Sequence, residues 1–301
     1  AVGIANSSPL IVGDLVYALT SNGPDQSQIV LPAPDAPSFI AVNKHTGKLV
    51  WQDNSPGDRI LDGQWSSPTY GVVNGKGQVY FPGGDGWLYA FEPLGDTENP
   101  GKGKIVWKFD GNPPGAKPGF GGRGSANSIV STAVFHDNRV YIAVGQNPEN
   151  GAGPGHLYCI DATKTGDVSE HQGEWDPVRR TKVNAKRNAN SALVWHYGDK
   201  DFGRSISTVA IQDDLIFAAD LAGFLHCLDV KTGQPHWQHD MLASVWGSPY
   251  VVDNKVYLGD EDGDMRIFEF SKQKKLVHEN HLGDSTTGTV VAADGVLYVA
   301  T

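Results

Sequence analysis

The feature that most constrains the fold of this chain is an internal repeat. A Ser-Pro or Ser-Thr step leads into an apolar run, then an Asp or Asn turn, then an apolar–aromatic pair such as Val-Tyr. These pairs begin at Val16, Val79, Val140, Ile216, Val256 and Leu297. The last two intervals, 216 to 256 and 256 to 297, span 40 and 41 residues. Such a period predicts one supersecondary unit copied along the chain, with longer intervals where insertions occur.

A second apolar stretch and a turn complete each unit. These stretches begin at Phe39, Leu88, Leu157, Leu225 and Met265. The residue that closes the unit is tryptophan in the first four: Trp51, Trp107, Trp195 and Trp237. The fifth unit has His278 at this position, so we expect its outer edge to pack less well.

Each unit supplies four short runs rich in β-branched and aromatic residues, separated by Gly, Asp and Asn turns. One four-stranded sheet cannot bury both of its apolar faces, whereas sheets stacked radially can. The repeat therefore predicts an all-β fold, a β-propeller of four-stranded antiparallel blades. A β-sandwich is the alternative, but it requires no near-identical motif at a fixed interval.

The expected blades form a single domain over residues 1–301. Five are complete, and the sixth stops after its second strand; their approximate ranges are 7–53, 66–109, 129–197, 206–240, 247–279 and 287–301. A ring that stops in mid-blade would leave a strand edge exposed. We therefore expect this chain to be a segment of a longer protein.

The combined pattern Ser-Ser-Pro, Asp-x-Val-Tyr, Asp-Gly-x-Leu-Tyr-Ala and Thr-Gly-x-x-x-Trp resembles the repeat of pyrroloquinoline-quinone (PQQ) proteins. Quinoprotein alcohol dehydrogenases and non-enzymatic outer-membrane assembly propellers share this repeat. Stretches 63–68 and 83–89 resemble bacterial PQQ-like repeat proteins common in planctomycetes. The resemblance implies an eight-bladed ring and a periplasmic or cell-envelope location, and it says little about activity.

Charge and hydropathy exclude two classes of partner. With 24 Lys and Arg against 34 Asp and Glu, the net charge is −10, whereas a nucleic-acid surface needs a basic stripe. No apolar run approaches the roughly 18 residues that predict a membrane span. Cys159 and Cys227 occupy one repeat position that is Ala41 and Ala90 in two other units, which favours packing over a disulfide.

Long insertions indicate where function lies. In a propeller blade, the loop between the second and third strands and the connection to the next blade emerge on one face. Segments 21–38, 110–127 and 145–156 are therefore expected on this loop-rich face, where binding tends to occur. Segment 166–192 joins a third to a fourth strand and is expected on the opposite face. It carries a basic run, read as a solvated loop or as a docking surface for an acidic partner: Arg179, Arg180, Lys182, Lys186 and Arg187.

Five residues on the loop-rich face are candidate ligand contacts. Trp65 and Trp246 each precede a Ser-Pro step at the start of an innermost strand, and could stack on a flat ligand or wedge between blades. Gln64 lies beside Trp65, and Asn127 ends the 110–127 connection. Arg123 lies among glycines and could clamp a carboxylate or phosphate, or be an ordinary surface arginine.

A run of carboxylates offers one candidate metal site. Asp260, Asp262 and Asp264 could bind calcium through oxygen ligands. The run lacks the full EF-hand pattern and falls where another blade uses Asp85-Gly86 to turn, so a plain hairpin turn is favoured.

Two functional hypotheses follow. The first is a non-catalytic binding or scaffold module that holds a protein or polysaccharide on the loop-rich face. The alternative, implied by the resemblance, is a PQQ- and calcium-dependent alcohol dehydrogenase. Quinoprotein alcohol dehydrogenases typically carry an adjacent Cys-Cys pair under the cofactor, and this chain has none. No calcium-ligand trio or catalytic Asp matches residue by residue, so no catalytic residue is predicted, and no paired carboxylates support a carbohydrate-active enzyme.

Overall fold

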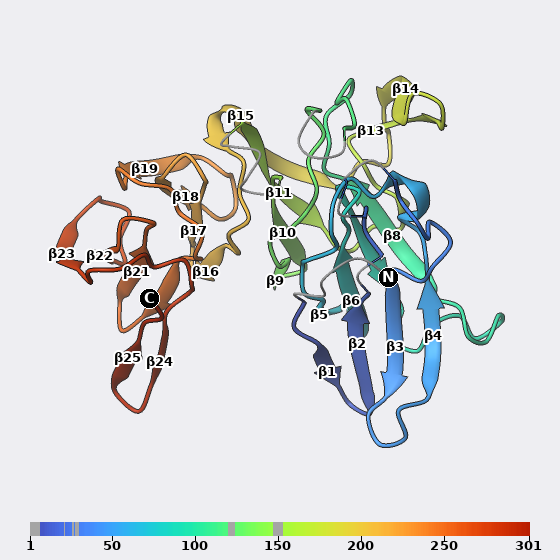
Figure 1. Cartoon of the computed structure of the whole chain (residues 1–301), viewed down its shortest axis with the longest axis horizontal. Coiled ribbons are helices and arrows are strands. Elements are labelled where there is room, and N and C mark those ends of the chain that lie inside the picture. Colours follow the sequence, from blue (N-terminus) through green and yellow to red (C-terminus); the bar gives the residue numbers. More distant parts are fainter. Residues whose placement is uncertain (1–6, 21, 26, 28–29, 120–123, 147–152) are drawn as a thin grey trace.

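The computed structural model describes the chain except for residues 1–6, 21, 26, 28–29, 120–123 and 147–152. Regular structure in the described part is almost entirely β, and its single helix is the short 3-10 helix η1 (Gly57–Arg59). Figure 1 shows the sheets in chain order along an open arc, with the first sheet and the last hairpin on its two limbs.

Each successive sheet is built from strands that are neighbours in sequence. The first sheet contains β1 (Leu10–Val12), β2 (Leu15–Leu19), β3 (Phe39–Asn43) and β4 (Leu49–Asp53). The second contains β5 (Thr69–Val73), β6 (Lys76–Pro82), β7 (Trp87–Phe91) and β8 (Ile105–Asp110). The third contains β9 (Val134–His136), β10 (Arg139–Val144), β11 (Pro154–Asp161) and β15 (Leu193–Gly203).

The remaining sheets repeat this order. The fourth contains β16 (Ala210–Gln212), β17 (Leu215–Ala219), β18 (Phe224–Asp229) and β19 (Pro235–Asp240). The fifth contains β20 (Tyr250–Val252), β21 (Lys255–Gly259), β22 (Asp264–Glu269) and β23 (Leu276–His281), and β24 (Val291–Ala293) pairs with β25 (Val296–Tyr298). The prediction of an all-β fold with four-stranded antiparallel sheets is confirmed; the blade ranges and the size of a complete ring stay predictions.

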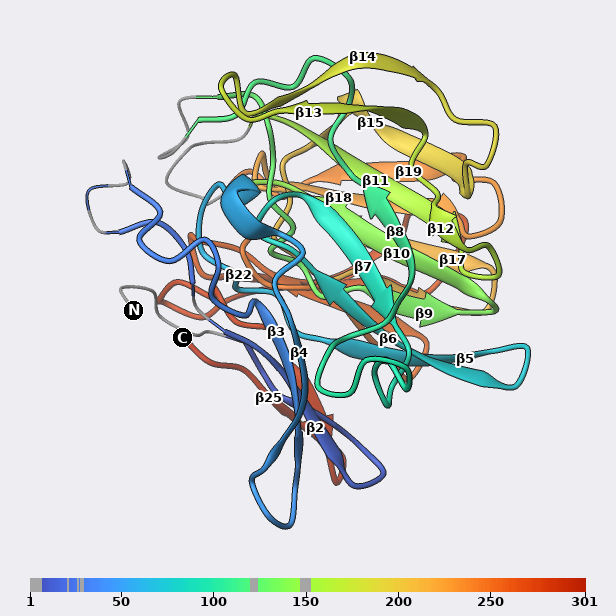
Figure 2. The ribbon, with the colours of Figure 1, turned by 90° about the vertical axis from the view of Figure 1, so that its right-hand side faces the viewer.

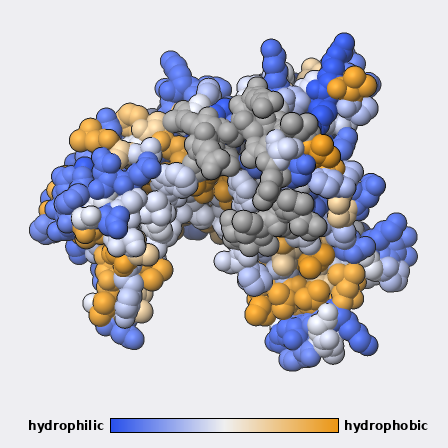
Figure 3. All heavy atoms as spheres, viewed as in Figure 1, coloured by the Kyte–Doolittle hydropathy of each residue, from blue (hydrophilic) through white to orange (hydrophobic). Residues whose placement is uncertain are grey.

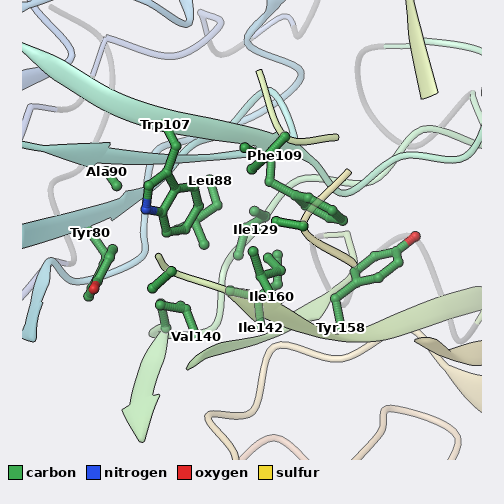
Figure 4. Packing of buried hydrophobic residues seen from close by; sticks show 14 of the residues in the cluster. Tyr80, Leu88, Ala90, Trp107, Phe109, Ile129, Val140, Ile142, Tyr158 and Ile160 are labelled. Atoms are coloured by element: carbon green, nitrogen blue, oxygen red, sulfur yellow. The ribbon is translucent and has the colours of Figure 1, made fainter. Parts of the chain in front are cut away.

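Buried side chains fill the spaces between neighbouring sheets, as stacking requires. Trp107 and Leu88 of the second sheet pack against Val140, Ile142 and Ile160 of the third (Figure 4). Equivalent clusters lie between the first and second, third and fourth, and fourth and fifth sheets. Each interior sheet thus buries both of its faces, which a single sheet could not do.

The closing position of the repeat behaves as its residue type predicts. Trp51 and Trp107 are fully buried and Trp195 and Trp237 nearly so, whereas His278 is exposed. Each of the four indoles donates its N–H to an oxygen: Pro93 O, Gln78 Oε1, Val230 O and Ser271 O. The outer strand of the fifth sheet, β23, is correspondingly exposed along most of its length.

The prediction that segment 166–192 lies opposite the loop-rich face is wrong for its hairpin. After β11, the chain forms β12 (Gly166–Asp167), which pairs in parallel with β8 on the outer edge of the second sheet. Because β12 runs in the direction of β8, it carries the chain to the end of the sheet where connection 110–127 begins. There β13 (His171–Asp176) and β14 (Thr181–Arg187) form a hairpin that stands beside that connection (Figure 2).

Hydrogen bonds hold this hairpin against the loop-rich face. Arg180 Nη2 donates to the carbonyl oxygens of Asp58, at 2.6 Å, and Ile60, at 3.3 Å. Thr181 Oγ1 donates to the carbonyl of Ala116 at 3.0 Å. The insertion begins after β11 and ends before β15, at the end of the sheet that strand order predicts. The long-range pairing of β12 moved its tip.

Candidate binding cleft

A cleft of about 160 Å³ lies under the β13–β14 hairpin, and we refer to it as the hairpin cleft. Its walls come from three parts of the chain: the second sheet with η1, the connection after β8, and the hairpin itself. The side chains that matter for binding are Arg59, Trp87, Lys108, Trp175 and Lys182. The surface around the projecting hairpin is mostly hydrophilic (Figure 3).

Cations surround the indole of Trp87. Lys108 Nζ lies 5.0 Å from the ring centroid, Lys182 Nζ 5.2 Å, and the Arg59 guanidinium carbon 5.8 Å. The same guanidinium carbon lies 5.9 Å from the ring of Trp175. Gly86 adopts a φ of +80°, a backbone conformation that residues with a side chain rarely adopt. The turn at Gly86 places Trp87 at the start of β7. Contacts of this kind stabilise positive charge close to an apolar surface.

Two buried carboxylates in the cleft each hold one of these cations. Asp85 Oδ2 accepts from Tyr89 Oη at 2.6 Å and from Arg59 Nε at 3.3 Å. Asp110 lies 2.6 Å from Lys182 Nζ. Burial raises the pKa of both carboxyl groups, and the paired cation opposes the shift in each case. Arg59 and Lys182 are therefore committed to partners within the protein.

Two donors in the same cleft have no such partner. Among the described residues, Lys108 Nζ has no hydrogen-bond acceptor or carboxylate, only its contact with Trp87. Trp175 Nε1 is buried and likewise has no acceptor in the described part of the chain. An unpaired buried donor such as Trp175 Nε1 is costly, and it favours a ligand that brings acceptor oxygens, which would also give the Lys108 ammonium a charged partner.

Four of the five sequence candidates for ligand contact lie outside the hairpin cleft. Gln64 and Asn127 are buried where the chain turns into inner strands; Gln64 Nε2 donates to Asn22 Oδ1, and Asn127 Nδ2 donates to the carbonyl of Pro154 at 3.4 Å. Trp65 and Trp246 are half-buried and do not line the hairpin cleft. Arg123 lies outside the described residues. A ligand role for these five residues stays a prediction.

Asp260 is engaged within its own turn. Its Oδ1 accepts from the backbone N–H of Asp262 at 3.1 Å and of Asp264 at 3.0 Å, and its Oδ2 lies 2.5 Å from Arg266 Nη1. Arg266 also contacts Glu279 at 2.6 Å. In the part of the chain that the structure describes, no group of three or more His, Cys, Asp or Glu side chains could hold a metal ion. Calcium binding at Asp260, Asp262 and Asp264 stays a prediction, as does the PQQ alternative.

The pairing of a buried turn carboxylate recurs in other sheets. Asp220 Oδ2 lies 3.0 Å from His226 Nε2 in the fourth sheet, and Asp85 is bonded to Tyr89 in the second. Tyr89, His226 and Arg266 share one position in the repeat, directly after the residue that opens the second apolar stretch. Comparing this position between units is the sequence signal that could have revealed the pairing.

A histidine pair beside the cleft was not predicted. His156 Nδ1 lies 3.0 Å from His196 Nε2, and His156 is 3% exposed. Burial lowers the pKa of His156 to about 4, and the charge of the neighbouring His196 lowers it further. Burial also lowers the pKa of His196, although the nearby carboxylate of Asp199 opposes this shift. The two residues are 40 positions apart. They meet because β11 pairs with β15.

We expect this histidine pair to make stability depend on pH. The folded-state pKa of His156 is depressed, so the unfolded chain binds more protons and stability falls as pH drops below about 6.5. The loss reaches on the order of 3 kcal/mol near pH 4. Urea unfolding of the wild type and of His156→Gln at pH 7 and pH 4.5 measures it, and His156→Gln should show a smaller loss. An equal loss in both proteins would contradict this assignment; the exposed His278→Gln is the control.

The comparisons with known proteins agree on the fold. Residues 179–301 match the family described as outer membrane protein assembly factor BamB. BamB from Moraxella catarrhalis is similar over 99% of this chain and 70% of its own, with a TM-score of 0.64 and 17% identity. The chain therefore has the β-propeller fold of BamB, and its residues 179–301 are similar in sequence to that family. Its propeller also resembles the computationally designed Ika8 protein, with a TM-score of 0.59 and 12% identity over 98% of this chain and 67% of that one.

Two further comparisons limit what can be carried over to this propeller. A europium-containing methanol dehydrogenase aligns with a TM-score of only 0.48 and 12% identity, over 98% of this chain and 72% of that one, too low to bear on activity. No curated protein matches the sequence at a significant level. Among the described residues, no helix is long and apolar enough to cross a membrane.

Proposed function

We propose that this BamB-like propeller is a non-catalytic binding module that holds a partner protein on its loop-rich face. The observation that carries the proposal is the hairpin cleft, where three separate segments place aromatic rings and unpaired donors together. Long loops on a rigid all-β scaffold are a common way to build a binding surface. The long insertion that forms the hairpin turns toward this same face.

A protein is the preferred partner over a polysaccharide. The matching family is described as an outer membrane protein assembly factor, and assembly implies protein partners. We extend this to the present chain as part of the proposal, together with a periplasmic or cell-envelope location.

Site-specific photo-crosslinking tests this proposal. A benzoylphenylalanine placed at Val178, which is 91% exposed at the hairpin tip, should cross-link one partner protein in cells of the source organism. The same probe at Lys48, in the exposed turn between β3 and β4 at the other end of the blades, is the matched control and should give no such adduct. Mass spectrometry of the adduct identifies the partner. Adducts that are equal at both positions, or absent at position 178, would refute the proposal.

A further inference from the structure

The hairpin cleft has the chemistry of a carboxylate receptor, and we infer that it takes an acidic side chain from a partner protein. This inference rests on the proposed function and names the chemistry that the partner must present. Four cationic residues line the cleft (Arg59, Lys108, Arg180 and Lys182), against three carboxylates (Asp85, Asp110 and Asp167). The surplus positive charge is local, because the chain as a whole carries −10.

The three carboxylates of the cleft are already satisfied by the protein. Asp85 is bound by Arg59 and Tyr89, and Asp110 by Lys182. Asp167 Oδ1 accepts from the backbone N–H of Ser169 at 3.1 Å. None of them is therefore the partner of Lys108, whose ammonium rests on the face of Trp87. An incoming carboxylate would give this ammonium its first charged partner.

Trp175 supplies a second, independent reason to expect an acceptor. Its indole N–H is shielded from solvent and unpartnered within the described residues, although the residue lines the same cleft as Lys108. Lys108 comes from β8 and Trp175 from β13, so two unrelated segments each leave a donor without an acceptor. One carboxylate has two oxygens and can accept from both donors.

The size of the cleft selects a side chain rather than a larger ligand. A cavity of about 160 Å³ is close to the roughly 150 Å³ that accommodates a benzene-sized group. It admits the end of a Glu or Asp side chain and excludes a folded element. The exposed basic residues Arg179, Lys186 and Arg187 belong to the hairpin itself, and they favour further acidic residues in the partner segment that binds there.

Peptide binding tests the inference with purified protein. A fluorescein-labelled octaglutamate peptide should bind in a fluorescence anisotropy titration, an octaglutamine peptide should not, and binding should weaken as salt is raised. Lys108→Met retains the aliphatic stem and should weaken binding about tenfold or more, because a charge-assisted hydrogen bond is lost. Trp175→Phe retains an aromatic ring but removes the indole N–H, and it should weaken binding roughly fivefold. Circular dichroism confirms that each variant is folded.

A matched lysine and a competing anion make the test decisive. Lys48→Met removes an exposed charge far from the cleft and should leave affinity within about twofold. Equal effects of Lys108→Met and Lys48→Met, or equal affinity for octaglutamine, would overturn the inference. The inference would also be overturned if inorganic phosphate displaced the peptide at a concentration similar to that of the peptide, because the cleft would then be a site for free anions. Cross-linking at position 178 without octaglutamate binding would sink this inference alone and leave the proposed function intact.

Discussion

Replacing Trp107 with alanine should lower the free energy of unfolding by about 3–5 kcal/mol. The indole is fully buried between the second and third sheets, with its ring 5.7 Å from that of Tyr80. Its Nε1 donates to Gln78 Oε1 at 2.9 Å. Alanine leaves a cavity that the flanking sheets cannot fill without moving apart, and it strips the buried amide oxygen of Gln78 of a donor.

Urea unfolding followed by circular dichroism measures this loss, and the repeat provides its control. His278 occupies the corresponding position in the fifth unit but is exposed, so His278→Ala should change the free energy of unfolding by no more than about 0.5 kcal/mol. Similar losses in the two variants would show that the position stabilises the fold through local strand structure and not through packing between sheets.

Replacing Arg266 with methionine should also cost about 3–5 kcal/mol. The arginine is 4% exposed and neutralises Asp260, whose side chain is fully buried in the turn before β22. Methionine retains much of the apolar volume but leaves a carboxylate that can neither reach water nor find another cation. A buried ion pair adds little net stability, whereas a buried charge that has lost its partner strongly destabilises the fold.

A double-mutant cycle separates the pair from its surroundings. Asp260→Asn combined with Arg266→Met should recover part of the stability that Arg266→Met loses, because no charge is then left buried. Lys275→Met breaks the exposed ion pair with Glu269 and should cost no more than about 0.5 kcal/mol. An Arg266→Met variant as stable as Lys275→Met would mean that Asp260 does not depend on Arg266 in the folded protein.

Much of the fold could be predicted because the pattern of apolar runs and turn residues repeats along the sequence. The β-branched and aromatic runs determine strands, the Asp, Asn and Gly turns separate them, and the tryptophan in four units marks the outer strand that packs on the next sheet. A departure from the pattern is also predictive: His278 replaces the tryptophan in the fifth unit, and it is exposed. Each of these properties depends on neighbours within one unit or on the adjacent unit, so a repeat comparison captures it.

The candidate site could not be predicted in the same way. Trp87 lies inside the repeat stretch 83–89, and Lys182 belongs to the basic run of segment 166–192. Nothing in their local sequence indicates that both approach one cleft with Lys108 and Trp175. Gln64 and Asn127, two of the residues that the sequence predicts as ligand contacts, form hydrogen bonds to Asn22 and Pro154 outside this cleft, and their ligand role stays a prediction.

By itself, the sequence determined the repeating unit, the all-β class and the stacking of sheets, since these follow from hydrophobic pattern and turn chemistry within about 40 residues. Only the tertiary structure decided where the binding cleft lies. Segment 166–192 begins and ends at one end of its sheet, yet two residues of β12 pair with β8 and direct the hairpin to the other end. Backbone pairing with a neighbouring sheet's edge leaves no periodic trace in the sequence, because any residue can supply its N–H and C=O groups.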